Sequence, residues 1–305
     1  MDGVTFIGTT SMENILIGND VSQHIFILSQ KLKASAISQF QAKGKQVSGY
    51  VPWIAAGSDI DFDFPNELFL HPALNNRGSF VNDLPYLHAA KSYLEISLSR
   101  MKYHPGLMPG PREDWLPDKI TSSSTPNNIL EGIKTLRTAS NAFGTLYDEL
   151  VEFVLPLGDK HRGYSNCSVR GVIFRGFPET WNKYDVALDL AHELGHHSLF
   201  VWQSIDSILA SPVDKPVYSS VRKDDRPAIQ SFHGAVALAY MLSITQKWQK
   251  NEISDEVKKR HGSFYAGGSL ESALTEALHT LHENCEFTPV GAKMMSEMQA
   301  LLPNN

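Results

Sequence analysis

The sequence predicts an α+β fold that is predominantly helical, with a small sheet. Apolar residues recur at helical spacing through several long segments. One short run, "CSVRGVIFRGFP" at residues 167–178, instead has β-branched and aromatic residues between turn residues, as a strand does. No internal repeat is visible, so a solenoid or propeller is not expected.

In the first half of the chain the pattern predicts a helix over residues 21–42. Its apolar stripe consists of Ile25, Phe26, Leu28, Leu32, Ile37 and Phe40. Residues 51–82 carry Pro, Gly and Asn at short intervals and are expected to be irregular. A second helix is expected over 84–102, with Pro85 in its first turn. The Pro, Gly and Ser residues of 104–128 indicate a linker or lid.

The second half predicts a helix over 128–153, the strand within 167–178, and a helix over 179–204. Another helix is expected from Pro227, and a further one after Gly267 and Gly268. We therefore expect an N-terminal helical and irregular region, 1–110, as the candidate substrate-binding part. Residues 111–305 would form the metal-binding catalytic region, with both regions folded separately or as one compact domain.

Composition limits the classes of function. The chain has 305 residues, 42% of them hydrophobic, which is enough to bury a sizeable core. Its formal net charge is −6 and it has no long basic block, so nucleic acid is not an expected partner. No signal peptide and no apolar run of about 18 residues is visible, so we expect a cytoplasmic protein without a membrane partner. Two cysteines, Cys167 and Cys285, are too few for a disulfide framework.

The segment "DVALDLAHELGHHSLF" contains an H-E-x-x-H motif at residues 192–196. Residues four apart share one face of a helix, so His192 and His196 can present two imidazoles to one ion. Glu193 is a candidate catalytic residue, because it can hold a metal-bound water or support a ligand. His197 is expected to be a polar surface residue or an orienting partner. A chance match of a short motif is the alternative interpretation.

The third ligand decides the kind of site. The metzincin pattern fails, because Leu199 and Trp202 occupy its Gly and His positions. A glutamate from a downstream helix is available at Glu271, Glu276 or Glu283, in surroundings unlike the usual pattern. His233, in "RPAIQSFHGAVALAYM", lies on an apolar helix face and is the better candidate, although such a histidine is often only a hydrogen-bonded core residue.

Two segments together carry a family resemblance. "AHELGHHSL" (191–199) and "SSVRKDDRPAIQSFHG" (219–234), preceded by "SVRGVIFRGFPE", resemble the HExxH-type peptide β-hydroxylases, over about residues 165–245. These are 2-oxoglutarate-dependent enzymes that modify ribosomally made peptides. The resemblance implies that His192, His196 and His233 bind Fe(II). It also implies that Arg226, or alternatively Arg222, binds 2-oxoglutarate together with Ser220.

The function that the resemblance implies is hydroxylation of the β-carbon of a residue in a precursor peptide, with dioxygen consumed. A zinc metallopeptidase with Zn(II) and Glu193 as general base is the alternative. A non-enzymatic helical module with a structural metal is less favoured, because closed zinc sites have four protein ligands. Aromatic residues in the irregular segments are candidates for lining a peptide cleft or for anchoring the loops: Trp53, Phe62, Phe64, Phe69 and Trp115.

Overall fold

The computed structural model describes residues 14–17, 23–45, 47, 127–156, 165, 170–178, 180–248 and 255–303. Several predictions lie outside these residues: the irregular stretch 51–82 with its aromatic residues, the helix over 84–102, and most of the linker over 104–128. The proposed boundary between 1–110 and 111–305 lies outside them too.

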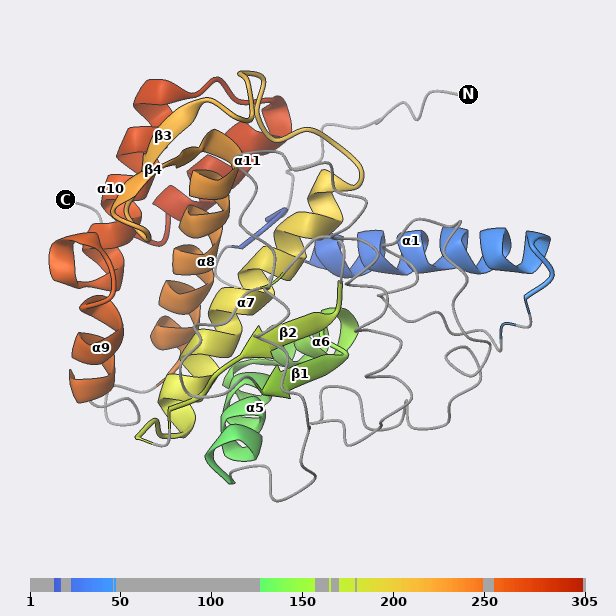
Figure 1. The fold of residues 1–305 in the computed structure, drawn as a ribbon, viewed down its shortest axis with the longest axis horizontal. Helices are drawn as coiled ribbons and strands as arrows, with labels where there is room; N and C mark the ends of the chain where they lie inside the picture. Colours follow the sequence, from blue (N-terminus) through green and yellow to red (C-terminus); the bar gives the residue numbers. More distant parts are fainter. Residues whose placement is uncertain are drawn as a thin grey trace.

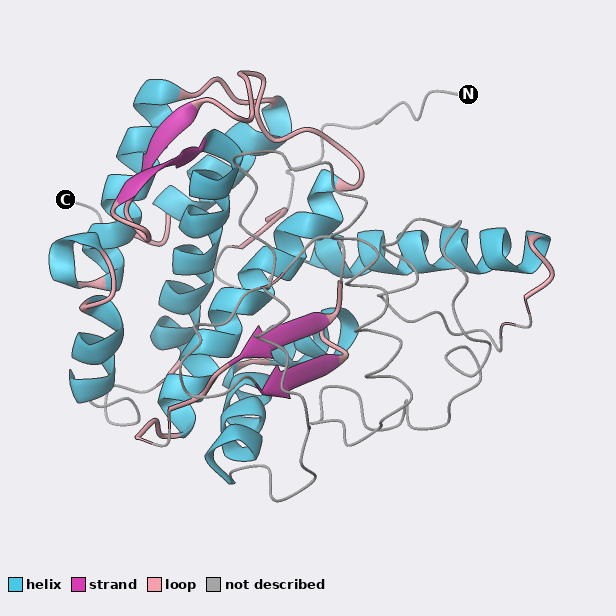
Figure 2. Cartoon of the chain, viewed as in Figure 1, coloured by secondary structure: helices cyan, strands magenta, loops and turns pink. Residues whose placement is uncertain are grey.

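The described chain is mostly helical (Figure 2). Two pairs of short strands accompany the helices: β1 (Phe153–Pro156) with β2 (Val172–Arg175), parallel, and β3 (Pro216–Ser219) with β4 (Asp224–Pro227), antiparallel. This confirms the predicted predominantly helical α+β class with little sheet. The helices are α1 (Gln23–Ala42), α5 (Asn127–Ala139), α6 (Asn141–Leu150), α7 (Lys183–Gln203), α8 (Ala228–Lys247), α9 (Asp255–Gly262), α10 (Leu270–Asn284) and α11 (Pro289–Gln299), with a 3-10 turn at Ala266–Gly268.

Helices α7 and α8 lie side by side at the centre of the molecule (Figure 1). Helix α5 packs against α7, and α10 packs against α8. Gly195 permits the central contact, because a Cβ at this position would be 3.1 Å from the Cα of Ala237 and 3.2 Å from the carbonyl oxygen of Val236. A side chain at this position would push the two helix backbones apart by a few tenths of an ångström, so glycine suits this close contact.

In the described part of the chain, α8 is the helix that is long and apolar enough to cross a membrane by length and composition. However, 78% of its most apolar window is buried inside the protein. Its apolar character is therefore accounted for by its central place in the core, and it gives no clear membrane-spanning signal.

Helix α7 begins at Lys183 because Asn182 and Asp185 form a capping box. The Asn182 side chain accepts from the backbone N–H groups of Tyr184 and Asp185, and the Asp185 carboxylate accepts from the N–H of Asn182 at 2.9 Å. The predicted start at residue 179 was four residues early, because this box satisfies the first amides of the helix at Lys183.

The prediction of one helix over 128–153 is wrong. The chain breaks at Ser140, whose side chain accepts from the N–H of Phe143 and so starts α6 as a separate helix. Gly144 allows this bend, because a Cβ there would be 2.5 Å from the carbonyl oxygen of Arg137. Strand β1 then begins at Phe153 and pairs with β2, the only part of the predicted strand segment 167–178 that forms a described strand.

The β3–β4 hairpin was not expected from the sequence. Its turn, residues 220–223, includes Lys223 at φ 58°, and the N–H of Lys223 donates to the carbonyl of Ser219 at 2.7 Å. Val221 of this turn lies 3.0 Å from where a Cβ of Gly234 would be. Because Gly234 has no side chain, Val221 of the hairpin turn can pack against α8 next to His233 in sequence.

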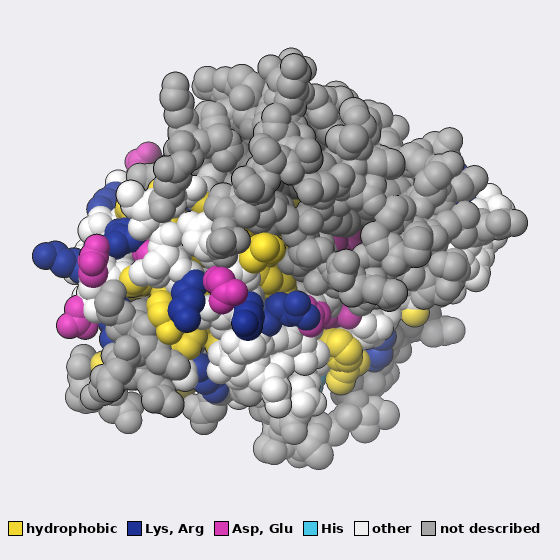
Figure 3. Space-filling view, turned by 90° about the horizontal axis from the view of Figure 1, so that it is seen from below, with side chains coloured by type: hydrophobic (Ala, Val, Ile, Leu, Met, Phe, Trp, Pro, Cys, Tyr) yellow, Lys and Arg dark blue, Asp and Glu magenta, His cyan; other side chains and the backbone are white. Residues whose placement is uncertain are grey.

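The surface carries both signs of charge. On the face in Figure 3, basic and acidic side chains of described residues lie beside one another, with apolar side chains between them.

Candidate metal centre

The three histidines selected from the sequence meet where α7 packs on α8. The Nε2 atoms of His192 and His196, one helical turn apart on α7, are 3.2 Å from each other. The Nδ1 of His196 lies 3.3 Å from the Nδ1 of His233 on α8. The three imidazoles therefore form one continuous cluster across two helices, with His196 in the middle.

A partner at the end of α7 sets the orientation of His233. Its Nε2 is 3.0 Å from the amide oxygen Oε1 of Gln203, which can only accept a hydrogen bond. The proton of a neutral His233 is therefore on Nε2, and the lone pair is on Nδ1, toward His196. Gln203 was not identified from the sequence, since nothing at the end of a helix marks a glutamine as the partner of a residue 30 positions away.

The ring nitrogens of the three histidines do not converge on one position. His196 directs one ring nitrogen to each neighbour, so its ring has to turn before one nitrogen from each histidine can meet a single ion. Accordingly, within the described residues no group of three or more His, Cys, Asp or Glu side chains is arranged to hold a metal. The donors themselves suit a divalent transition metal, because imidazole is a good ligand for iron and zinc.

Burial keeps these imidazoles neutral. Burial is the main reason why the pKa of His196 falls to about 4, and the charge of Arg222 lowers it further. Burial, and then the neighbouring His196, also lower the pKa of His192 and of His233 well below the ordinary value. At neutral pH all three rings are therefore uncharged, and each has one ring nitrogen without a proton, as a metal ligand requires.

A second stripe on α7 runs beside the histidine stripe. Asp185, Asp189, Glu193 and His197 follow one another at four-residue spacing, and all four are buried. Because buried charges need partners, each member of this stripe requires a group from elsewhere in the chain. The interpretation of His197 as a surface residue is wrong, since it is 3% exposed.

Ser165 connects Glu193 and His197, the two members of this stripe nearer the C-terminal end of α7. Its hydroxyl donates to Oε2 of Glu193 at 2.5 Å, and its Oγ lies 3.3 Å from Nε2 of His197. The N–H of Gly171 donates to Nδ1 of His197 at 3.4 Å. Burial raises the pKa of Glu193, whereas Arg175, the Ser165 hydrogen bond and Arg222 lower it. In the described part of the chain, no hydrogen bond joins Glu193 to His192, His196 or His233.

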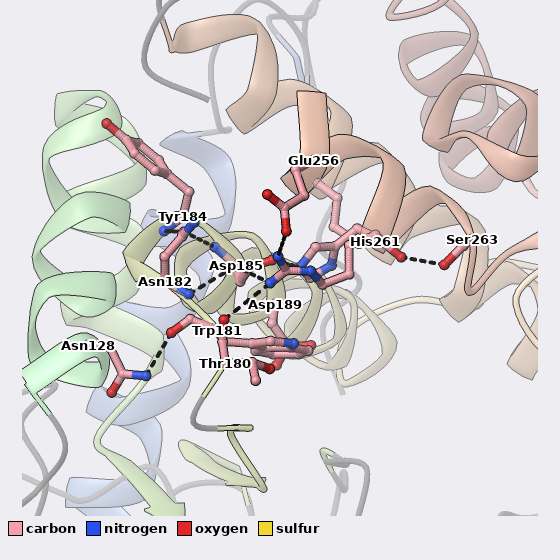
Figure 4. A network of polar contacts seen from close by, with 12 residues as sticks. Asn128, Thr180, Trp181, Asn182, Tyr184, Asp185, Asp189, Glu256, His261 and Ser263 are labelled. Atoms are coloured by element: carbon pink, nitrogen blue, oxygen red, sulfur yellow. Dashed lines mark hydrogen bonds and ion pairs between the residues drawn. The ribbon is translucent and has the colours of Figure 1, made fainter. Parts of the chain in front are cut away.

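The two members nearer the N-terminal end of α7, Asp185 and Asp189, each pair with an arginine side chain (Figure 4). Asp185 accepts from Arg260 of α9 at 2.8 Å and lies 3.2 Å from Nε2 of His261. Asp189 forms an ion pair with Arg175 of β2. The ring of Trp181 contacts this network, with the Arg175 guanidinium 5.4 Å and the His261 ring 5.3 Å from its centroid.

The hairpin residues selected from the sequence occupy different parts of the hairpin. Arg222 is in the turn, and it is close enough for its charge, after burial, to lower the pKa of His196. Arg226 is on β4 opposite Val217, and its buried Nε has no hydrogen-bond partner among the described residues. The Ser220 hydroxyl is buried and donates to the carbonyl of Ala273 in α10 at 2.8 Å.

The downstream glutamates lie on the outer side of α10. Glu271 and Glu283 are exposed, and Glu283 is 3.3 Å from His279 on the same helix. Glu276 is half-buried. These positions give no support for a glutamate as the third ligand.

Comparison with known proteins identified no relative. No protein-family model matches the chain, and no curated protein matches it either.

Proposed function

We propose that this protein is a non-haem Fe(II)- and 2-oxoglutarate-dependent oxygenase that hydroxylates the β-carbon of a residue in a ribosomally made peptide. The observation that carries the proposal is the cluster of neutral imidazoles of His192, His196 and His233 at the α7–α8 contact. With 2-oxoglutarate and dioxygen, bound iron supplies oxidation of a C–H bond to an alcohol, with release of succinate and carbon dioxide.

The donor set agrees with this chemistry. Three protein ligands leave positions open for a chelating keto acid and for dioxygen. His192 and His196 would hold the ion from α7, and His233, oriented by Gln203, would hold it from α8. An outer partner such as Gln203 fixes the ring and the tautomer of a ligand histidine.

A cation is required for the second carboxylate of 2-oxoglutarate, and arginine can bind it through two parallel hydrogen bonds. Arg222 is favoured over Arg226, because it follows Val221 in the turn that packs against Gly234, the neighbour of His233, and its charge lowers the pKa of His196. Ser220 would act less directly, since its hydroxyl already bonds to Ala273. The precursor peptide, dioxygen and a cytoplasmic location complete the proposal.

A zinc metallopeptidase is the second candidate, because Glu193 adjoins the histidine cluster and burial raises its pKa. A general base must be free to take a proton from metal-bound water. In this structure one carboxylate oxygen, Oε2, accepts a hydrogen bond from Ser165, and no hydrogen bond joins Glu193 to the three histidines among the described residues.

The test is anaerobic. Metal-free protein is mixed with Fe(II), then with 2-oxoglutarate, and the visible charge-transfer band of a chelated keto acid is recorded. We expect the band to be lost in His233→Ala and to require roughly tenfold more 2-oxoglutarate in Arg222→Ala, with a smaller change in Arg226→Ala. A wild-type protein that gives no band and holds zinc tightly would contradict the oxygenase proposal.

Glu193→Gln then separates the two candidates. A peptidase that loses its general base should lose about 10²-fold or more of its activity. The oxygenase should still form the keto-acid band, because the amide keeps the size of the side chain and no metal ligand is removed.

A further inference from the structure

We infer that Ser165 is a positioning residue that holds the carboxylate of Glu193 beside, but not within, the metal centre. This inference rests on the proposed function for its metal-related part. It rests on geometry alone for the hydrogen bond itself. Ser165 stands at the start of the stretch that resembles the family, outside the motifs quoted for it, and no sequence pattern singled it out.

The direction of the hydrogen bonds follows from the donors available. A serine hydroxyl has one proton to donate, and the carboxylate oxygen of Glu193 at 2.5 Å is the nearest acceptor. The Nε2 of His197, at 3.3 Å, must then donate to Ser165 Oγ. This agrees with the N–H of Gly171 donating to the other ring nitrogen of His197. The sequence of bonds from Gly171 to Glu193 therefore has a donor and an acceptor at every step.

The consequence concerns the open side of the metal. Glu193 follows His192 directly in sequence and lies on the neighbouring stripe of α7, with no hydrogen bond to the three histidines among the described residues. A carboxylate is itself a metal-binding group, so a Glu193 side chain released from Ser165 would compete for an ion held by the histidines. A hydrogen bond to an ionised oxygen is about twice as strong as a neutral one, so Ser165 strongly favours the observed position of the carboxylate. Held by Ser165, Glu193 would not compete with 2-oxoglutarate for an ion bound by the histidines.

A double-mutant cycle tests the bond without any metal. The variants are Ser165→Ala, Glu193→Ala and the pair, and thermal unfolding of the full-length protein is measured. We expect Ser165→Ala to lower Tm by about 4 °C, as expected for loss of a hydrogen bond to a buried charged group. In the Glu193→Ala background the same change should cost no more than about 1 °C. Additive effects would overturn the inference.

The metal-related part is measured with Co(II), whose visible spectrum reports its ligands. The half-saturating concentration of 2-oxoglutarate for the Co(II) protein should rise on the order of tenfold in Ser165→Ala, because Glu193 then competes. The increase should be absent in the double variant relative to Glu193→Ala. Ser165→Thr, which keeps a hydroxyl, should behave like the wild type.

Ser29→Ala is the matched control. The Ser29 hydroxyl also lies against a buried carboxylate, 2.8 Å from Oε1 of Glu149, but between α1 and α6, and it shares its proton with the carbonyl of Phe26 at 2.7 Å. It should lower Tm and leave the 2-oxoglutarate response unchanged. An unchanged response in Ser165→Ala would overturn the positioning role. A wild-type protein whose Co(II) spectrum ignores 2-oxoglutarate would refute the proposed function, whereas the cycle would still decide whether Ser165 holds Glu193.

Discussion

Single carboxylates are stable inside this protein where a cation or a donor from a distant part of the chain reaches them. Asp189 is 6% exposed and pairs with Arg175, but Oδ2 of Asp189 and Nε of Arg175 have no hydrogen-bond partner among the described residues. Burial therefore outweighs the attraction of Arg175 and raises the pKa of Asp189 to about 6.

This raised pKa gives stability a specific pH dependence. Between pH 4 and pH 6 the folded protein binds more protons at Asp189 than the unfolded chain does, so this residue stabilises the fold as pH falls. We expect the Tm difference between wild type and Asp189→Asn to grow in favour of the wild type by about 3 °C from pH 7 to pH 5. Asp148→Asn, which breaks the exposed pair with Arg137, is the control. A constant difference for Asp189→Asn would contradict the assignment.

The three histidines could be selected from the sequence, because each stands in a recognisable local pattern. His192 and His196 follow from their spacing on one helix, and His233 was proposed as a polar residue on an apolar face. Ser165 and Gln203 could not be found in this way, because each acts through a contact between residues 28 or 30 positions apart. The choice between Arg222 and Arg226 also needed the fold, since the hairpin that separates them was not predicted.

At the level of elements, two glycines set the distances between the parts of the site. Gly195 fixes how closely α7 approaches α8, where the obstacle to a Cβ is backbone of Ala237 and Val236. Gly234 seats the hairpin turn, where the obstacle is the side chain of Val221. A backbone obstacle cannot move away, whereas a side chain can turn, so the two positions should respond differently to a methyl group.

We expect Gly195→Ala to lower Tm by several degrees and to weaken Co(II) binding, because it separates His196 from His233. Gly234→Ala should cost less stability. It should keep Co(II) binding but raise the 2-oxoglutarate concentration needed, because it displaces the turn that carries Arg222. Thermal unfolding and Co(II) titration distinguish the two. Equal effects of both variants on metal and on 2-oxoglutarate would show that the helix contact and the hairpin are not separate parts of the site.

The elements also show where sequence patterns are informative. Long apolar periodicity located α1, α7, α8 and α10 to within a few residues. It failed over residues 128–153, where the apolar pattern continues through the break and only the side-chain bond of Ser140 ends one helix and starts the next. It also missed the β3–β4 hairpin, because "PVYS" and "DDRP" are too short and too polar for alternation to be visible.

At the scale of the whole molecule, the two ends of the described chain are joined through one carboxylate. Glu297 of α11 is 4% exposed, and its side chain accepts from the three backbone N–H groups of residues 15–17, at 2.6 to 3.0 Å. The carbonyls of this segment accept from Trp202 of α7 and Tyr240 of α8. The N-terminal segment is thus fixed by side chains from three helices, including the two that carry the candidate metal ligands.

This arrangement predicts that Glu297→Ala is among the more damaging single substitutions far from the metal centre. Three buried N–H groups would lose their acceptor, and each buried unsatisfied donor costs about 1–3 kcal/mol, so the free energy of unfolding should fall by at least about 3 kcal/mol. Urea unfolding of the full-length chain measures the loss.

Glu256→Ala is the matched control, because its carboxylate, 80% exposed, pairs with Arg260 at the surface and should change stability by less than about 1 kcal/mol. Similar losses in both variants would mean that the N-terminal segment does not depend on Glu297. A large loss limited to Glu297→Ala, with an accompanying decrease in Co(II) affinity, would show that the packing of α7 on α8 depends on the segment fixed against them.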